Sequence, residues 1–224
     1  MRRSVCLAVF AATSLVSATA LADGGANFGK SGQLVITWDQ ALTSTYAYGS
    51  SGPLPSVTNV GSPGSASMLD FEYVGVSNNY GSFTHFGIAP SAHFFVTDNL
   101  SVGGQLVLGI GSYSPSQGPG TSVTNVGIAP EIGYNIGIND MFSFWPKLFF
   151  GYQNEALSNN GGSYSQAVLG VYAPFLFHVA PHFFLGIGPN LSTQLVSTQA
   201  NGPDLPKATV FGIMATFGGY FLGT

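Results

Sequence analysis

The chain has 224 residues, of which only 6% are charged, with five Lys and Arg against nine Asp and Glu. A soluble surface needs about 25–35% charged residues of both signs, and nucleic-acid binding needs a basic stripe. An ordinary soluble protein and a nucleic-acid-binding protein are therefore both excluded. Apolar residues make up 45%, which excludes disorder driven by charge repulsion. The composition therefore indicates a protein whose outer surface does not face water.

The first 22 residues read as an export signal that is removed from the mature protein. They show the three parts of such a signal: a basic start at Arg2 and Arg3, an apolar run over residues 5–12, and a small-x-small site at residues 20–22. Cleavage is expected before Asp23, and residues 23–30 are expected to form an N-terminal tail. Cys6 lies within the signal, so the mature chain has no thiol chemistry.

Beyond the signal, no segment is apolar for long enough to cross a bilayer as a helix, and an apolar exterior then leaves a closed barrel. Eight segments alternate apolar and polar or small residues, as strands with one face toward lipid do: 33–42, 84–96, 100–110, 123–136, 142–153, 164–178, 182–193 and 207–221. The fold is predicted as all-β: a closed antiparallel transmembrane β-barrel of eight strands in an up-and-down meander, spanning residues 31–224.

The links between these segments alternate in length. Short links lie near residues 97–99, 138–140 and 179–181, and longer polar links lie at 44–80, 112–122, 156–163 and 196–206. Short periplasmic turns and longer external loops are typical of outer-membrane barrels. Pro90, Pro130 and Pro174 occupy equivalent places in three hairpins and are expected near the periplasmic rim. Residues 171–177 are apolar on both faces, which leaves the register of the strand over 164–178 open and suggests a bulge near the third proline.

The hairpin over residues 123–153 provides the one candidate interior ion pair. A three-residue turn centred on Asn139 would place Glu131 directly opposite Lys147, both facing inward. Such a pair is usually a structural contact, because it keeps either charge from being buried alone. A gate in a transport pathway is the alternative.

The first long link contains the candidate surface contacts. Residues 68–76 read as a strand, either in a strand extension or small hairpin above the membrane or, less favoured, as part of a ten-stranded barrel. The aromatic side chains expected to contact an external partner are Tyr46, Tyr48, Phe71 and Tyr73.

The export signal, the repeated hairpins and the aromatic closing strand Phe217–Phe221 make the chain resemble the eight-stranded OmpA-like outer-membrane β-barrel family. The resemblance covers the barrel, residues 31–224, and not the peptidoglycan-binding domain of larger relatives. It implies location in the outer membrane, with outer-membrane lipids as partners. It also implies contact with the barrel assembly machinery and periplasmic chaperones during biogenesis, and an unknown extracellular partner.

Three functions remain open. The leading one is a structural or surface-interaction role through the external loops, and the second is a narrow channel or carrier for small or apolar solutes. The third, a lipid-modifying enzyme, is the least favoured, because the four histidines lack a paired nucleophile and acid in the sequence. No cofactor, no metal and no catalytic residue is expected. His178 and His182 have helical spacing but bracket a predicted turn, which does not suit a metal site.

Overall fold

The computed structural model describes residues 27–48, 72–78, 81–115, 120–158, 162–200 and 207–221. Among these residues, no helix is long and apolar enough to cross a membrane. Most of the described residues lie in antiparallel strands: β1 (Leu34–Tyr48), β2 (Glu72–Asn78), β3 (Gly81–Ile88), β4 (Pro90–Thr97), β5 (Leu100–Pro115), β6 (Thr121–Tyr134), β7 (Ile136–Gly137), β8 (Phe142–Phe144), β9 (Lys147–Leu157), β10 (Ser163–Tyr172), β11 (Phe175–Ala180), β12 (Phe183–Gln199) and β13 (Ala208–Phe221).

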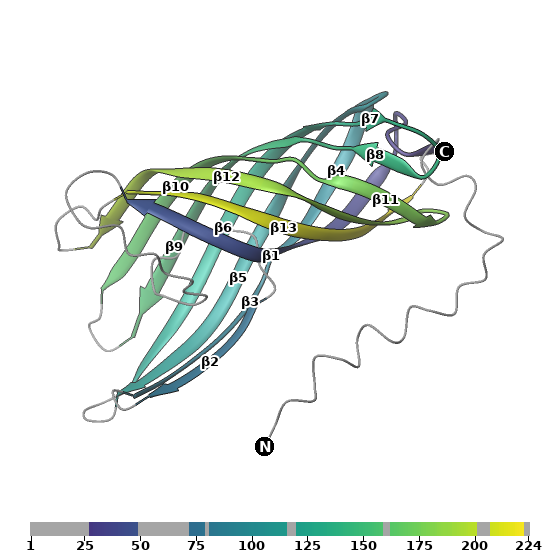
Figure 1. Cartoon of the computed structure of the whole chain (residues 1–224). Coiled ribbons are helices and arrows are strands. Elements are labelled where there is room, and N and C mark those ends of the chain that lie inside the picture. Colours follow the sequence, from purple (N-terminus) through teal and green to yellow (C-terminus); the bar gives the residue numbers. More distant parts are fainter. Residues whose placement is uncertain are drawn as a thin grey trace, which may run out of the picture.

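Short interruptions separate some of these elements, so that they form eight wall strands of one barrel. The wall strands are β1, β3 with β4, β5, β6 with β7, β8 with β9, β10 with β11, β12 and β13. Each pairs antiparallel with the next along the chain, and β1 closes the barrel by pairing with both β13 and β4. Figure 1 shows these strands tilted around a common axis. The predicted closed eight-stranded antiparallel barrel is confirmed.

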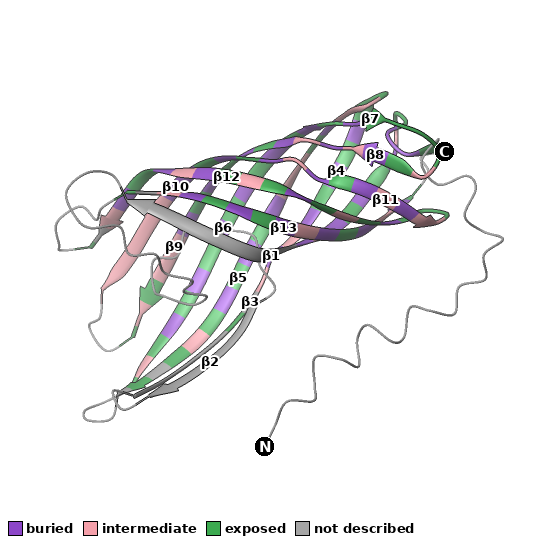
Figure 2. Ribbon diagram, viewed as in Figure 1, coloured by how far each residue is buried: buried purple, intermediate pink, exposed green. Residues whose placement is uncertain are grey.

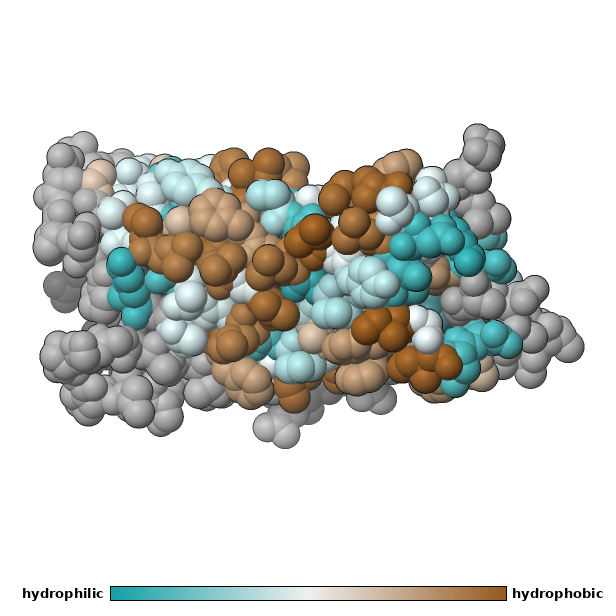
Figure 3. All heavy atoms as spheres, turned by 90° about the horizontal axis from the view of Figure 1, so that it is seen from above, coloured by the Kyte–Doolittle hydropathy of each residue, from teal (hydrophilic) through white to brown (hydrophobic). Residues whose placement is uncertain are grey.

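The two faces of the wall differ as the alternation predicts. Along β6 buried and exposed residues alternate without a break, so that Ile128 is 59% exposed and the next residue, Ala129, is fully buried. Figure 2 shows buried and exposed residues alternating along much of the coloured wall as well. The exposed members are mainly Leu, Ile, Val and Phe, and in Figure 3 hydrophobic residues cover much of the middle of one face, with hydrophilic residues toward its right-hand end. This exterior suits hydrocarbon, where every backbone polar group must be satisfied within the closed ladder.

Three tight turns define one end of the barrel, which we call the turn end; the opposite end is the loop end. Two of the turns have two residues between their strands and contain a non-glycine residue with positive φ, Asn99 (70°) or His182 (63°). The third turn differs from the prediction. Gly137 pairs with Ser143, which centres this turn on Asp140 instead of Asn139.

The side chain of Asn139 explains the longer turn and its effect on register. Its Oδ1 accepts hydrogen bonds from the backbone N–H groups of Met141 and Phe142, each at 2.9 Å, an Asx-type closure. Lys147 therefore lies opposite Gly133, and Glu131 lies opposite Phe149. The predicted direct pairing of Glu131 with Lys147 in the ladder is wrong. A shift of two residues leaves every side chain on its predicted face.

A hairpin extends the wall at the loop end. Strand β2 pairs with β3 from Glu72↔Gly87 to Asn78↔Gly81, whereas the ladder between β1 and β4 runs from Leu34↔Phe94 to Trp38↔Pro90. The strand predicted over residues 68–76 is thus present from residue 72 as one arm of a hairpin. Residues 68–71 lie outside the described residues.

The irregular region around residues 164–178 contains a bulge, but not at the predicted place. The register between β10 and β12 shifts between Ala167 and Val168, where Leu195 is the extra residue. As a result, Leu195 and the next residue, Val196, are both exposed. The bulge therefore lies on the loop-end side of Gly170, and not between Gly170 and Pro174.

Prolines interrupt the ladder inside the wall and not at its rim, contrary to the prediction. Pro90 pairs with Trp38, well within β1. In three successive wall strands, the carbonyls of Pro146, Pro174 and Pro189 each accept a backbone hydrogen bond at 3.0 Å from the neighbouring strand, while their nitrogens have no hydrogen to donate. We call these three residues the proline seam.

Candidate functional site: the filled lumen

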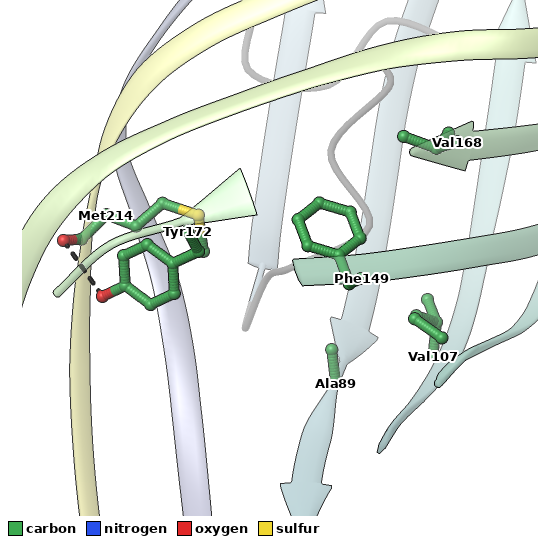
Figure 4. Close-up of a cluster of buried hydrophobic side chains, with 7 residues drawn as sticks. Ala89, Val107, Phe149, Val168, Tyr172 and Met214 are labelled. Carbon is green, nitrogen blue, oxygen red and sulfur yellow. Dashed lines mark hydrogen bonds between the residues drawn. The ribbon is translucent and has the colours of Figure 1, made fainter. Parts of the chain in front are cut away.

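The interior of the barrel holds two clusters of buried apolar side chains, one above the other. The loop-side cluster consists of Ala89, Val107, Ala129, Phe149, Val168, Tyr172 and Met214. The turn-side cluster consists of Phe28, Val35, Phe95, Trp145, Leu176, Phe184 and Tyr220. Figure 4 shows the loop-side cluster, in which the hydroxyl of Tyr172 donates a hydrogen bond of 3.3 Å to the carbonyl of Met214. No member of either cluster exposes more than 7% of its surface, so side chains fill the lumen at both levels.

Between the two apolar clusters lies a group of ionisable side chains, Asp39, His93, Glu131 and Lys147, which we call the luminal charge cluster. Lys147 Nζ lies 2.6 Å from Asp39 Oδ2 and 3.4 Å from Glu131 Oε2. His93 Nε2 lies 3.0 Å from the same Glu131 oxygen. The side chains of all four are at most 2% exposed.

The position of Lys147 on β9 places its ammonium group between the two apolar clusters. Two residues before it, Trp145 belongs to the turn-side cluster, and two residues after it, Phe149 belongs to the loop-side cluster. Its Nζ also lies 5.2 Å from the ring centre of Trp145 and 5.1 Å from that of Tyr172, within cation–π range. The ammonium is therefore held by two carboxylates and two aromatic rings in a site closed to solvent.

The structure brings together the two interior residues singled out from the sequence, although through a diagonal contact and not a ladder pair. It adds Asp39 and His93, which the sequence pattern did not link to that pair. Asp39 is 108 residues from Lys147 in the chain, and only closure of the barrel brings β1 opposite β9. Long-range contact of this kind leaves no local signal in a single sequence.

The segment before β1 is the other feature that the sequence did not reveal. Residues 27–33 fold into the turn end instead of hanging free, and Phe28 is 3% exposed within the turn-side cluster. The backbone N–H of Gly32 donates to the carbonyl of Phe95, and the N–H of Phe95 donates to the carbonyl of Gln33, at 2.8 and 2.9 Å. An aromatic residue next to a glycine was the one available signal, because such a pair suits a buried anchor at a tight bend.

The candidate surface contacts fall partly outside the described region. Tyr46 and Tyr48 lie near the end of β1, where they pair with Val210 and Ala208, and Tyr73 pairs with Phe86 across the β2–β3 hairpin. Phe71 lies outside the described residues. All three described residues therefore sit in strands at the loop end.

One serine–histidine pair occurs in the lumen, which the sequence did not predict. Ser143 Oγ lies 3.0 Å from His178 Nε2, and both residues are buried. His178 Nδ1 has no hydrogen-bond partner among the described residues, so the pair lacks the third group that orients the base in a catalytic triad. Within the same described part of the chain, no group of three or more His, Cys, Asp or Glu residues could hold a metal ion.

The closed ladder, the apolar exterior and the filled interior define a small transmembrane β-barrel. No protein-family model matches the chain, and no curated protein matches it. Among solved structures, the chain is similar to Neisserial surface protein A (NspA), at 12% identity and a TM-score of 0.42, covering 83% of this chain and 96% of that one. It is also similar to Ail, the attachment invasion locus protein of Yersinia pestis, at 15% identity and a TM-score of 0.41, covering 85% of this chain and 99% of that one.

Proposed function

We propose that this chain is an outer-membrane barrel that acts as a sealed scaffold, with a structural or surface-interaction role carried by its loop end. The exterior supports membrane insertion, since every wall strand has exposed large apolar side chains among its described residues. The three short turns support an orientation with the turn end toward the periplasm, as in outer-membrane barrels generally. Outer-membrane lipids are then its immediate surroundings, and export and barrel-assembly factors its partners during biogenesis.

The observation that carries this proposal is the filled lumen. Trp145 and Phe184 are fully buried in the turn-side cluster, and Ala129 and Val168 are fully buried in the loop-side cluster. An eight-stranded barrel is just wide enough to be filled by side chains, and here two apolar levels and one charged level fill it. A solute path through such an interior would require several side chains to move together.

The loop end supports a role in contact with a partner outside the cell. The β2–β3 hairpin extends beyond the ladder that joins β1 to β4 and bears Tyr73, and Tyr46 and Tyr48 lie near the end of β1. We propose these residues, with Phe71, as contacts for an extracellular partner. No catalytic role is proposed, because the Ser143–His178 pair has no acid hydrogen-bonded to His178 Nδ1 among the described residues.

Conductance in planar bilayers tests the scaffold proposal directly. The refolded protein should give no steady current at moderate voltage. If its lumen were open, the current would instead rise in discrete steps. Steady single-channel steps from the wild-type protein, abolished by an antibody against the protein, would overturn the proposal. Whole-cell binding assays that compare cells expressing the wild type with cells expressing Tyr73→Ala then test the surface role. Where expression of the wild-type protein increases adhesion, an equal increase with Tyr73→Ala would argue against Tyr73 as a contact residue.

A narrow channel remains the second candidate, favoured by the polar atoms around the luminal charge cluster. Asp39 Oδ1 and Glu131 Oε1 are buried without a hydrogen-bond partner among the described residues, as groups along a cation path would be. If the wild type conducts, Lys147→Met should change its conductance and selectivity, since it removes the one ammonium group that joins both carboxylates. A conducting wild type whose conductance is unchanged by Lys147→Met would exclude a gating role for the cluster.

A further inference from the structure

The turn end contains a cage of aromatic rings that surrounds one side chain from the N-terminal segment. The ring of Phe28 lies 5.2–5.4 Å from five other rings, those of Phe95, Trp145, His178, Phe184 and Tyr220. These five rings come from five different wall strands or their junctions. Four of the five contacts are edge-to-face, the geometry that aromatic pairs prefer. The cage is therefore matched in shape and chemistry to one phenyl group.

The wall also binds the backbone of Phe28 and Gly29. Asn135 Nδ2 donates a hydrogen bond of 3.1 Å to the carbonyl of Phe28, and the backbone N–H of Asn99 donates one of 2.6 Å to the carbonyl of Gly29. These two donors come from a strand junction and a turn that are remote from the segment in sequence. Proteins also bind peptide segments by main-chain hydrogen bonds combined with a pocket for a side chain, and here the bound segment forms a turn.

Gly29 adds a requirement for a specific residue after the aromatic one. Its φ is +93°, a conformation that side chains rarely adopt. A Cβ at this position would also lie 2.6 Å from Asn135 Nδ2 and 3.1 Å from Asn99 Oδ1. The mouth of the barrel thus selects a pair, an aromatic residue followed by glycine.

The segment is held on one side and open on the other, which distinguishes it from a core strand. A cavity of about 320 Å³ lies beside it, lined by Phe28, Lys30, Asn99, Asn135 and the turn over residues 137–140. Its one ion pair, between Lys30 and Asp98, is long at 3.9 Å and largely exposed, so it contributes little. One side of Phe28 and Lys30 thus borders a cavity and not the wall, while the backbone N–H of Ser31 donates a hydrogen bond of 2.9 Å to Asp98 Oδ1.

We propose that the turn-end mouth is a peptide-binding site for an aromatic–glycine pair, and that Phe28 and Gly29 occupy it as a tethered ligand. In the full chain the site is filled by the protein's own N-terminal segment, which acts as a removable stopper beneath the luminal charge cluster. Release of the segment would expose the aromatic cage to the periplasmic side. This assignment goes beyond the scaffold role, because a sealed barrel needs no specific peptide site at its mouth.

The test uses the full mature chain and the fluorescence of Trp145, with Trp38→Phe introduced throughout so that Trp145 is the only tryptophan. Phe28→Ala should shift the emission to the red and increase quenching by acrylamide, because the cage loses its occupant. A peptide with the sequence of residues 26–32 should then bind this variant and reverse the shift, and it should not bind the chain with Phe28 intact. Phe94→Ala is the matched control, because Phe94 lies on the exposed face of β4 next to the cage residue Phe95. It should leave the emission and quenching of Trp145 unchanged.

Two altered peptides test the chemistry of the site. The peptide with Phe28→Ala should bind at least about a hundredfold more weakly, as expected for loss of a buried phenyl group, and the peptide with Gly29→Ala at least about tenfold more weakly. Equal binding of all three peptides, or equal binding to the chain with Phe28 intact, would overturn the proposal. Where Phe28→Ala gives no heat-modifiable band on gels, Phe28→Leu replaces it, because it keeps an apolar group in the cage but loses the ring contacts. Conductance is not the readout here, so a failed peptide assay leaves the scaffold proposal standing.

Discussion

Removing the ammonium group of Lys147 should be among the most destabilising single changes in this barrel. Lys147→Met keeps much of the apolar stem but leaves Asp39 and Glu131 without the cation that lies 2.6 and 3.4 Å from their oxygens. Both carboxylates are buried, and breaking a buried ion pair by removing one partner costs about 3–5 kcal/mol. The folding equilibrium should therefore fall by roughly two to three and a half orders of magnitude.

The measurement is urea unfolding of the protein in phospholipid vesicles, followed by tryptophan fluorescence and by heat-modifiable gel mobility. Lys30→Met is the matched control: Lys30 also faces an aspartate, but at 3.9 Å with both side chains more than half exposed, where a pair contributes about 0–1 kcal/mol. Neutralising both carboxylates as well, with Asp39→Asn and Glu131→Gln, should recover much of the loss. A Lys147→Met protein within about 1 kcal/mol of the wild type, or a triple variant no more stable than it, would refute this account of the cluster.

Two further predictions test the packing and the membrane-facing surface. Gly170→Ala should destabilise the barrel by about 1–3 kcal/mol, because the new Cβ would lie 2.3 Å from Phe149 Cζ. Gly137→Ala should have little effect, because nothing lies within 4 Å of a Cβ at that position. Equal urea unfolding midpoints for the two variants would contradict the packing described for Gly170. Ile128→Lys, on the exposed face of β6, should lower stability in vesicles by about 2–4 kcal/mol if that face meets hydrocarbon. Ile138→Lys, equally exposed but in a turn, is its control, and a similar small effect of both would argue against a lipid-facing wall.

The strands and their faces were predictable because lipid outside and side chains inside impose a period of two on the sequence. Residues 123–136 show this period without interruption, and β6 follows it residue by residue. The export signal stays a prediction, since residues 1–22 lie outside the described residues. The register of the next hairpin was not predictable from alternation, because a shift of two residues preserves the faces. The hydrogen bonds that Asn139 Oδ1 accepts within the turn determine this register.

The candidate site was predictable only in part, for a different physical reason. Glu131 and Lys147 lie in adjacent wall strands, so their approach followed from the local pattern. Asp39 reaches the same ammonium group through closure of the barrel, which depends on strand tilt around the whole wall. Phe28 lies in a short segment with no period at all, and its burial depends on a cage assembled from five distant places in the chain.

The proline seam has a consequence for the mechanics of the wall. Where Pro146, Pro174 and Pro189 lie side by side along three wall strands, the carbonyls still accept hydrogen bonds, but each proline removes one donor from the ladder. We therefore expect the wall to bend more readily along this line than along a fully bonded ladder. Lys147 directly follows the first of these prolines, and its contact with Asp39 ties this end of the proline seam to β1 through the lumen.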